Sequence, residues 1–316
     1  MKLSRLVLGA NVVAQSGIVV TGGLVRLTGS GLGCPTWPQC VPGSYTPVLE
    51  QADGWHPYIE FGNRLLTFVV GLTALAALVL VWRTGRRHLR PLAAAPLLGV
   101  VAQAVLGGVT VLTSLHPVTV AAHFLVSMVI VALSVWLYVR VHSPDGPARL
   151  VVAPVVHRLA LLLAAVGAAV LVVGTVVTGS GPHSGDAEAP ARFDLDPRTV
   201  SWVHADLVLL FVGLLVGLLV ALSATGAPQR VRERARWVLL VTLGQALIGY
   251  VQYATGLPEV LVALHMLGAV LLVVTLTALL AALRERTPLP ETDPGLTRGT
   301  ARTDPPRLRR TAASST

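Results

Sequence analysis

Three histidines lie within long apolar segments of the chain, where a polar side chain is costly and usually marks function. His123 is six residues past Pro117, His265 is seven past Pro258, and His204 is about five residues inside the predicted start of its helix. At about 1.5 Å of rise per residue, each lies roughly 8–10 Å below the same membrane surface. A single such histidine is most simply explained by a hydrogen bond between helices. Three at one depth favour haem iron, for which neutral imidazole is a common ligand.

The pattern of these histidines differs between the two parts of the chain. His204 and His265 fall on the second and fourth helices of the C-terminal half, so they could clamp one iron from both sides. In the N-terminal half, His123 corresponds to His265, but Asn63 stands in the place of His204. An amide is a poor ligand for haem iron, so we expect one strong ligand there. Zinc is the rival metal, but it needs further ligands, and only Asp206 lies near this depth.

Glu60 and Arg64 flank Asn63 closely enough for all three side chains to share one helix face. The spacing from Glu60 to Arg64 favours an ion pair, and one interpretation is a structural pair at a helix end. In the other, the carboxylate moves protons or stabilises developing positive charge at a haem pocket. Arg64 could also bind a haem propionate.

Cys34 and Cys40 flank the short sequence PTWPQ in a predicted outer loop. The outer compartment of bacteria is oxidising, so we expect a disulfide, as a staple or in a redox role. His56 and His116 lie at the membrane edge, where either could assist haem entry, although histidines are common there. His183, in the other long outer loop, is equally ambiguous.

Eight apolar segments have the length to position these residues across a membrane. The chain is 53% hydrophobic and 12% charged, with a mean hydropathy of +0.71. A soluble domain has about 25% charged residues, so most of this surface must face something other than water. Segments of about 20 apolar residues span a bilayer, and we place them at 6–26, 58–82, 91–113, 117–139, 155–178, 200–222, 236–255 and 259–283. The first is predicted to be a retained helix rather than a cleaved signal.

Basic residues predict the orientation of these helices. Of 24 Lys and Arg residues, 20 fall on the side that carries both termini, which should therefore be cytoplasmic, with loops 27–57 and 179–199 outside. The formal charge of +9 is thus explained by a plasma-membrane topology, with lipid rather than nucleic acid as the surrounding partner. The tail 287–316 is rich in Pro, Thr and Arg and is predicted to be disordered; binding of anionic lipid is the alternative role.

An internal repeat divides the chain. The sequence QAVLGGVTVLTSLHPVTVAAH (103–123) aligns without gaps to QALIGYVQYATGLPEVLVALH (245–265), and TGSG occurs at both 28–31 and 178–181. Matched Gln, Gly, Thr and His are less expected by chance than matched apolar residues. The sequence therefore predicts an all-α membrane protein of two pseudo-symmetric four-helix bundles related by an axis along the membrane normal, 1–145 and 146–286.

The run GGLVRLTGSGLGCPTWPQC, the run IEFGNRLL and the paired histidines resemble the bacterial haem A synthase family, over residues 1–285. The resemblance implies haem b on His204 and His265 and substrate haem O in the N-terminal half, on His123. It also implies oxidation of a methyl group of haem O to the formyl group of haem A. By the same resemblance Glu60 is the essential acidic residue and Cys34–Cys40 is a disulfide. The haem O synthase, a protohaem farnesyltransferase, is then a candidate partner.

This sequence departs from the family pattern at two places. Asn63 stands where a histidine is expected, and loop 179–199 has no second cysteine pair. Two other functions remain open from the residues alone. A bis-haem electron-transfer cytochrome would use the same paired histidines but has no need for Glu60 or an open iron. A haem transporter would place its site nearer the membrane centre.

Overall fold

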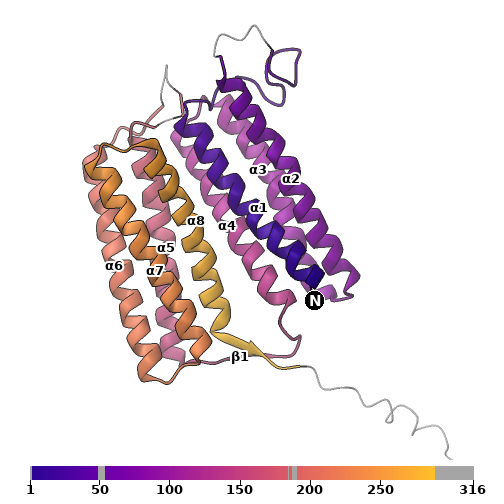
Figure 1. Cartoon of the computed structure of the whole chain (residues 1–316), viewed down its shortest axis with the longest axis vertical. Helices are drawn as coiled ribbons and strands as arrows, with labels where there is room; N and C mark the ends of the chain where they lie inside the picture. Colours follow the sequence, from indigo (N-terminus) through magenta and orange to yellow (C-terminus); the bar gives the residue numbers. More distant parts are fainter. Residues whose placement is uncertain (1, 49–53, 184, 187–190, 289–316) are drawn as a thin grey trace, which may run out of the picture.

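The computed structural model describes residues 2–48, 54–183, 185–186 and 191–288. Within them lie eight long helices, one short 3-10 helix and two short strands (Figure 1). All eight long helices have the length and hydropathy to cross a membrane. They are α1 (Lys2–Leu27), α2 (His56–Arg83), α3 (Arg90–Leu112), α4 (Pro117–Val141), α5 (Pro154–Ser180), α6 (Pro197–Ala224), α7 (Gln229–Ala254) and α8 (Glu259–Ala282). The predicted all-α, eight-span membrane fold is therefore confirmed.

Most helix ends lie close to the predicted boundaries, and the largest difference is at α7. This helix begins at Gln229, whereas the apolar run was predicted to begin at 236. The first turns of α7 are rich in arginine, which is a good helix former but does not count as apolar. Val231 and Ala235 in this stretch are fully buried, because one side of the charged segment still packs into the bundle. The predicted tail 287–316 lies almost entirely outside the described residues.

The helices form two groups that stand side by side, α1–α4 and α5–α8 (Figure 1). Within the first group α1 packs on α2 and α3 on α4, and within the second α5 packs on α6 and α7 on α8. The groups meet chiefly where α8 contacts α4 and α1. Consequently α4 and α8, which carry His123 and His265, are neighbours at the centre of the molecule. The predicted symmetry axis remains a prediction.

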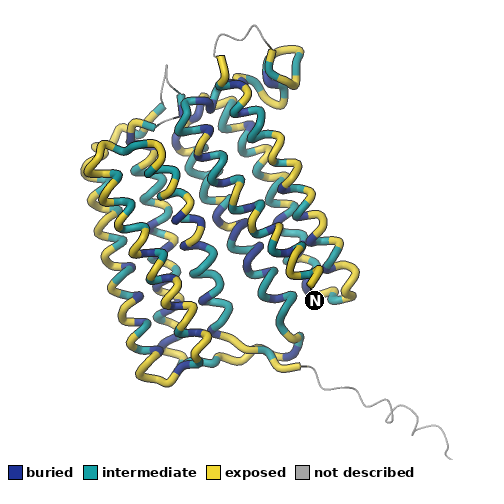
Figure 2. Tube along the Cα trace, in the orientation of Figure 1, coloured by how far each residue is buried: buried dark blue, intermediate teal, exposed yellow. Residues whose placement is uncertain are grey.

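Apolar side chains fill three regions of the interior. One lies within α5–α8 around Phe211, Leu215 and Leu218, and a second lies within α1–α4 around Leu8, Val81 and Leu137. A third joins the groups, through residues of α1, α4 and α8. Many large apolar side chains on the outward faces remain exposed (Figure 2). Such a surface is what a bilayer rather than water would solvate.

The α3–α4 and α7–α8 connections have the same backbone turn. Ser114 and Leu115 both have positive φ, 51° and 56°, and so do Gly256 and Leu257, 79° and 63°. Leu115 N–H donates to the Thr110 carbonyl at 2.9 Å, and Leu257 N–H donates to the Gln252 carbonyl at 2.7 Å. A non-glycine residue with positive φ is uncommon. Its recurrence at matched positions supports the predicted internal repeat.

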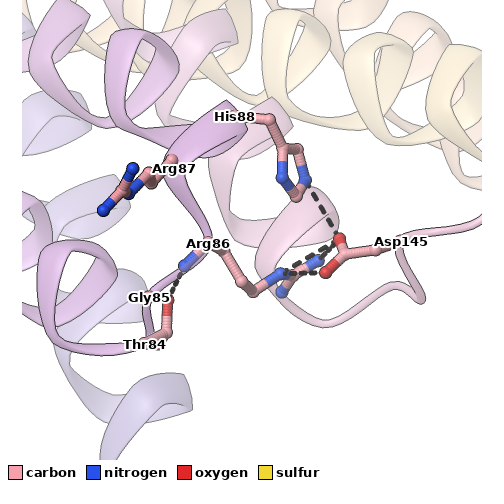
Figure 3. Close-up of a pocket in the computed structure, with 6 residues that line it drawn as sticks. All are labelled: Thr84, Gly85, Arg86, Arg87, His88 and Asp145. Carbon is pink, nitrogen blue, oxygen red and sulfur yellow. Dashed lines mark hydrogen bonds and ion pairs between the residues drawn. The ribbon is translucent and has the colours of Figure 1, made fainter. Parts of the chain in front are cut away.

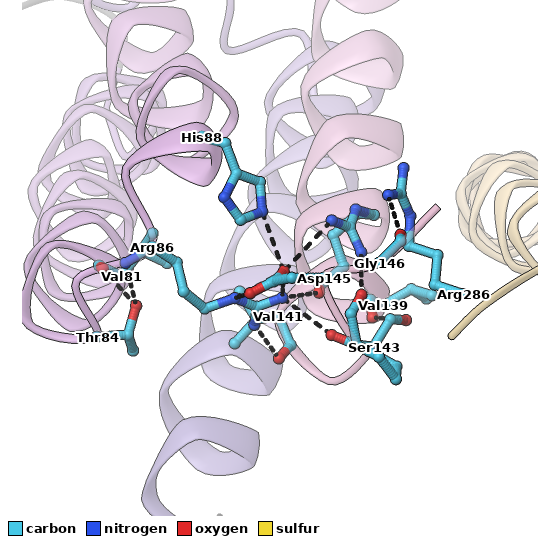
Figure 4. A network of polar contacts seen from close by, with 12 residues as sticks. Val81, Thr84, Arg86, His88, Val139, Val141, Ser143, Asp145, Gly146 and Arg286 are labelled. Atoms are coloured by element: carbon cyan, nitrogen blue, oxygen red, sulfur yellow. Dashed lines mark hydrogen bonds and ion pairs between the residues drawn. The ribbon is translucent and has the colours of Figure 1, made fainter. Parts of the chain in front are cut away.

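At the end of the bundle that carries the N-terminus, a polar network joins the α2–α3 connection to the α4–α5 connection (Figure 4). Arg86, in the α2–α3 connection, binds the Asp145 carboxylate and donates to the Val141 carbonyl at 2.7 Å and the Ser143 carbonyl at 2.9 Å. His88 Nε2 lies 3.0 Å from the same carboxylate. The side chains of Arg86, His88 and Asp145 line a cavity of about 620 Å³ (Figure 3). Arg86 thereby satisfies the last carbonyls of α4, which have no partner within the helix.

The same network continues into the C-terminal strand. Strand β1 (Ala148–Leu150) pairs antiparallel with β2 (Arg284–Arg286). Arg286 also donates to the Gly146 carbonyl at 3.1 Å. The segment between the two helix groups is therefore tied both to the first group, through Arg86, and to the end of the second.

We expect Asp145→Asn to lower the free energy of unfolding of the protein in detergent by about 1 kcal/mol at neutral pH, measured by thermal denaturation. The hydrogen bond from Arg86 lowers the pKa of Asp145. A lowered pKa in the folded state stabilises the fold above the ordinary carboxyl pKa of about 3.9, and this contribution is lost as pH falls below it. The gap between wild type and variant should therefore narrow below about pH 4. Asp194→Asn, at an exposed carboxyl near the other end, is the control; a pH-independent gap would contradict the assignment.

Candidate haem-ligand site

The three histidines lie near one end of their helices, the end with the longer connecting loops, called the loop end below. His123 is six residues after the first residue of α4, and His265 is six after the first residue of α8. His204 is seven after the first residue of α6, because that helix begins at Pro197 with Asp196 as its cap rather than near 200. At about 1.5 Å per residue, each is roughly 9–10 Å from the helix start. The structure thus brings them to a common depth.

His204 and His265 approach one another across the second helix group. Their ring centroids are 6.5 Å apart and their planes are inclined at 69°. With metal–nitrogen bonds of about 2 Å, two imidazoles on opposite sides of one metal ion have centroids about 6.4 Å apart. The separation of the two rings therefore fits one iron held between them.

Each histidine ring packs on a glycine of the neighbouring helix. A Cβ at Gly107 would lie 3.2 Å from Cε1 of His123, one at Gly174 3.2 Å from Cε1 of His204, and one at Gly249 3.4 Å from Cε1 of His265. A Cβ at Gly107 or Gly174 would require the ring to move by a few tenths of an ångström, and one at Gly249 would just touch it. Larger side chains would displace the rings, so these glycines are residues of the site that the sequence did not single out as such. The Nδ1 atoms of all three rings are buried without a hydrogen-bond partner in the described structure.

These side chains suit a porphyrin better than a bare ion. Among the described residues, no group of three or more His, Cys, Asp and Glu side chains is placed to hold a metal ion. Zinc draws all or most of its ligands from such groups. Haem iron receives four ligands from the porphyrin and needs only one or two from the protein. Two opposed imidazoles are therefore sufficient for haem.

Asn63 lies in the first helix group and is directed toward α1. Its Oδ1 accepts a hydrogen bond from the Thr21 hydroxyl at 2.8 Å. It lines a cavity of about 260 Å³ between α1 and α2, with Tyr58, Gly62 and Leu66 among its neighbours. No ring contact or hydrogen bond joins Asn63 to His123 within the described chain. His123 is thus without an imidazole counterpart in this half.

Glu60 and Arg64 form the predicted ion pair, and together they hold the first loop. Arg64 donates to Glu60 Oε1 from Nε at 3.0 Å and from Nη2 at 2.6 Å. The other carboxylate oxygen accepts the Cys34 N–H at 2.8 Å. Arg64 also donates to the carbonyls of Cys34 at 3.0 Å and Thr36 at 3.1 Å. Glu60 is only 6% exposed, so the pair stabilises the loop from a buried position.

These contacts separate three residues that the sequence placed on one helix face. Glu60 and Arg64 turn to the loop, whereas Asn63 turns to α1. All three nitrogens of the Arg64 guanidinium already donate within the protein, including Nη1 to the Gln39 carbonyl at 3.3 Å. The geometry supports the structural interpretation of Arg64 over its use as a propionate ligand.

The loop held by this pair covers the end of α3. Cys34 and Cys40 form the predicted disulfide, and both are fully buried. The ring of Trp37, between them in sequence, packs directly on Gly108, where any Cβ would collide with it. The disulfide loop is therefore fixed above the site of the first helix group rather than free in solvent.

The loop end also joins the two helix groups, through Arg26. Its Nε donates to the His183 carbonyl at 2.6 Å, and its Nη2 donates to the Thr178 carbonyl at 3.2 Å. Leu115 packs on Gly31, in the α1–α2 loop, and on Gly185, in the α5–α6 loop. The sequence pattern gave no signal for this role of Arg26, because its partners are backbone carbonyls distant in the chain.

The edge histidines have local structural contacts. His56 Nδ1 lies 2.9 Å from the Ser30 hydroxyl, and His183 Nε2 lies 2.8 Å from the Leu257 carbonyl. His116 caps α4 by accepting the Val118 N–H. None of the three is directed at the ring of another histidine in the part of the chain that the structure describes.

Eight apolar helices with two opposed imidazoles near one membrane surface define a multi-pass membrane protein with a ligand pair suited to haem iron. Residues 5–187 match the family described as cytochrome oxidase assembly protein, COX15-CtaA. Because this match covers more than half of the chain, the protein belongs to that family, and the resemblance predicted from the sequence is confirmed.

Several curated relatives carry the name heme A synthase. That of Sinorhizobium fredii is 26% identical, over 80% of this chain and 82% of its own length. Those of Geobacillus kaustophilus and Lysinibacillus sphaericus are 31% and 33% identical, over 42% and 40% of this chain. The match spans 41% of the length of each of these two relatives.

We expect Arg64→Met to loosen the disulfide loop without unfolding the bundle, because it removes every donor that holds the Cys34 and Thr36 carbonyls. Hydrogen–deuterium exchange of the described loop residues 28–48 should rise by about ten-fold or more, since one buried charge-assisted contact contributes about 1.5–3 kcal/mol. Arg83→Met, at an exposed arginine in the last turn of the same helix, is the matched control and should leave the exchange of the loop unchanged. Equal exchange in wild type and Arg64→Met would show that the anchor lies elsewhere.

Proposed function

We propose that this protein is a haem A synthase, an enzyme that oxidises one methyl group of haem O to the formyl group of haem A for cytochrome oxidase assembly. The single observation that carries the proposal is the unequal pair of histidine sites, with opposed imidazoles in one half and a lone one in the other. Family membership and the names of the relatives support it.

In the C-terminal half, residues 146–286, His204 and His265 would hold haem b as a resident cofactor. When bound, this haem supplies one-electron redox chemistry. Two protein ligands would leave no position for a reactant, so this site would suit a haem that exchanges electrons. Gly174 and Gly249 allow the rings to lie close to their neighbouring helices.

In the N-terminal half, residues 1–145, His123 would bind the iron of substrate haem O. Asn63, tied to Thr21, provides no second imidazole, so the opposite face of the substrate remains available for the oxidising species. In successive steps the methyl carbon gains one oxygen atom and loses four electrons to an external oxidant. A substrate that enters and leaves also favours one protein ligand over two.

Glu60 is proposed as the essential acidic residue of this half. It is buried beside the disulfide loop, and its two oxygens accept from Arg64 and from the Cys34 N–H. In this position it can hold or transfer a proton near the substrate and couple the loop to the site at the same time. The Cys34–Cys40 disulfide maintains the loop segment that Glu60 binds.

The setting we propose is the plasma membrane, with both termini cytoplasmic and the loop end outside, as the distribution of basic residues predicts. Haem O is a lipid-like substrate, so direct transfer from the haem O synthase is the proposed route of supply. Residues 287–316 would form a cytoplasmic tail.

Haem extraction and mass spectrometry after expression with a source of haem O test the function. Haem A or its hydroxylated precursor is expected from the wild type, and only unchanged haems would be recovered from an electron-transfer cytochrome or a haem transporter.

We expect His265→Ala to lose the resident low-spin haem and His123→Ala to lose turnover while retaining that haem. Equal loss of resident haem in both variants would show that the halves are wrongly assigned.

Gly174→Val should displace His204 and abolish low-spin haem in the C-terminal half, because a Cβ there already lies 3.2 Å from the ring. Haem content per protein should fall about ten-fold or more, the effect expected when a ligand is misplaced by its supporting residues. Gly217→Val, on α6 where a Cβ would meet nothing within 4 Å, is the matched control. A low-spin spectrum of wild-type intensity in Gly174→Val would refute this role of the glycine.

A further inference from the structure

Two glutamines make the same contact in the two halves of the molecule. Gln103 on α3 donates from Nε2 to the main-chain carbonyl of His123 on α4, at 2.7 Å. Gln245 on α7 donates from Nε2 to the main-chain carbonyl of His265 on α8, at 2.8 Å. The two glutamines occupy matched positions of the sequence repeat, as the two histidines do. A side chain has thus been placed twice on the backbone of a candidate iron ligand.

This contact adds a second donor to a carbonyl that belongs to a helix. The carbonyl of each histidine is already an acceptor for the N–H four residues later in its own helix. The His123 carbonyl also accepts from the Ser127 hydroxyl of its own helix at 3.0 Å, so Gln103 is the donor that comes from outside α4. An additional donor from a neighbouring helix therefore fixes how α4 lies on α3, and α8 on α7, at the level of the imidazole. Inside a membrane an amide without a partner is costly, so such a contact is maintained once formed.

The surroundings of the two glutamines differ. Gln103 Nε2 also contacts the Ser127 hydroxyl, one turn beyond His123. The counterpart of Ser127 is Ala269, which has no hydroxyl, and the Gln245 side chain instead crosses α8 at Gly268, where any Cβ would collide with it. In both halves the amide oxygen is buried and has no hydrogen-bond partner among the described residues.

We infer that Gln103 and Gln245 are positioning residues that set the imidazoles of His123 and His265 against the iron, through the backbone of each histidine. The inference rests on the proposed haem sites. His204 has no equivalent contact: within the described chain no side chain donates to its carbonyl. Loss of Gln245 should therefore release one side of the resident iron, at His265, while His204 stays in place.

Optical and electron paramagnetic resonance spectra of the full-length protein, purified with its resident haem, test this. In Gln245→Leu we expect a high-spin fraction that wild type lacks, and about ten-fold weaker retention of haem against a competing haem-binding protein. Gln252→Leu is the matched control on the same helix, since no hydrogen bond joins the Gln252 side chain to a histidine in the described structure. A wholly low-spin spectrum with wild-type haem retention in Gln245→Leu would overturn the inference.

Two further variants guard against misfolding. Gly268→Ala places a Cβ where the Gln245 side chain lies, so it displaces that side chain while residues 245 and 265 keep their identity. It should produce the same high-spin fraction. Gln245→Glu, whose neutral carboxyl can donate one O–H to the same carbonyl, should restore most of the low-spin signal. If Gly268→Ala folds and keeps a wholly low-spin spectrum, the inference fails by this route as well.

Gln103→Leu tests the other half in the same protein. It should leave the resident low-spin spectrum unchanged and raise the KM for haem O more than it lowers kcat, because it loosens a substrate ligand. A changed resident spectrum, or an unchanged KM, would count against the proposed role. Wild-type protein that contains no haem when haem is plentiful would contradict the proposed function. If wild type and Gln245→Leu both contain haem with the same low-spin spectrum and retention, only the role of Gln245 is contradicted.

Discussion

The structure depends on one constraint: a polar side chain inside the hydrocarbon layer must have a partner or a use. The three histidine rings satisfy it only in part. Each packs on a glycine and is half-buried, yet the Nδ1 of each has no protein partner in the described structure. Backbone groups nearby are fully engaged by helices and by Gln103 and Gln245. The His204 ring also has a backbone hydrogen bond to Val170, so it is the Nδ1 atoms rather than the whole rings that lack a partner in the described structure. The separation of the two rings in the second half suits iron.

The two halves share a framework but have diverged inside it. The α3–α4 and α7–α8 hairpins have the same turn conformation, and in each a glutamine of the first helix donates to the backbone carbonyl of a histidine in the second. The first helices of the halves differ: Asn11 and Gln15 are buried in α1, whereas the corresponding positions of α5 hold Leu161 and Ala165. Together with Asn63, these differences make the first half the more polar one.

The loop end makes the two halves one unit. Arg26 extends from the first half to the backbone of the second, and Leu115 packs on one glycine from the α1–α2 loop and one from the α5–α6 loop. Glu60 and Arg64 fix the disulfide loop over α3 by hydrogen bonds to its backbone. The buried carboxylate of Glu60 therefore joins the start of α2 to the disulfide loop.

The sequence alone determined the eight helices, because about 20 consecutive apolar residues can satisfy their backbone only as a membrane helix. It also determined the common depth of the histidines, since helical rise fixes depth once a helix start is known. The sequence did not predict the early start of α7, because an arginine-rich helical turn is not recognised as part of an apolar span. It also did not predict that Asn63 is directed away from Glu60 and Arg64.

Only tertiary structure decided which neighbours each side chain meets. Helix geometry allows Glu60, Asn63 and Arg64 to share a face, but the partners were backbone atoms of a loop and a hydroxyl on α1. Likewise, the sequence does not show that Gly107 and Gly174 lie against histidine rings, and only the packed structure shows that a side chain at either position would crowd the ring. Periodicity and repeats constrain positions along a helix axis, whereas the rotation and approach of helices arise from packing between segments distant in the chain.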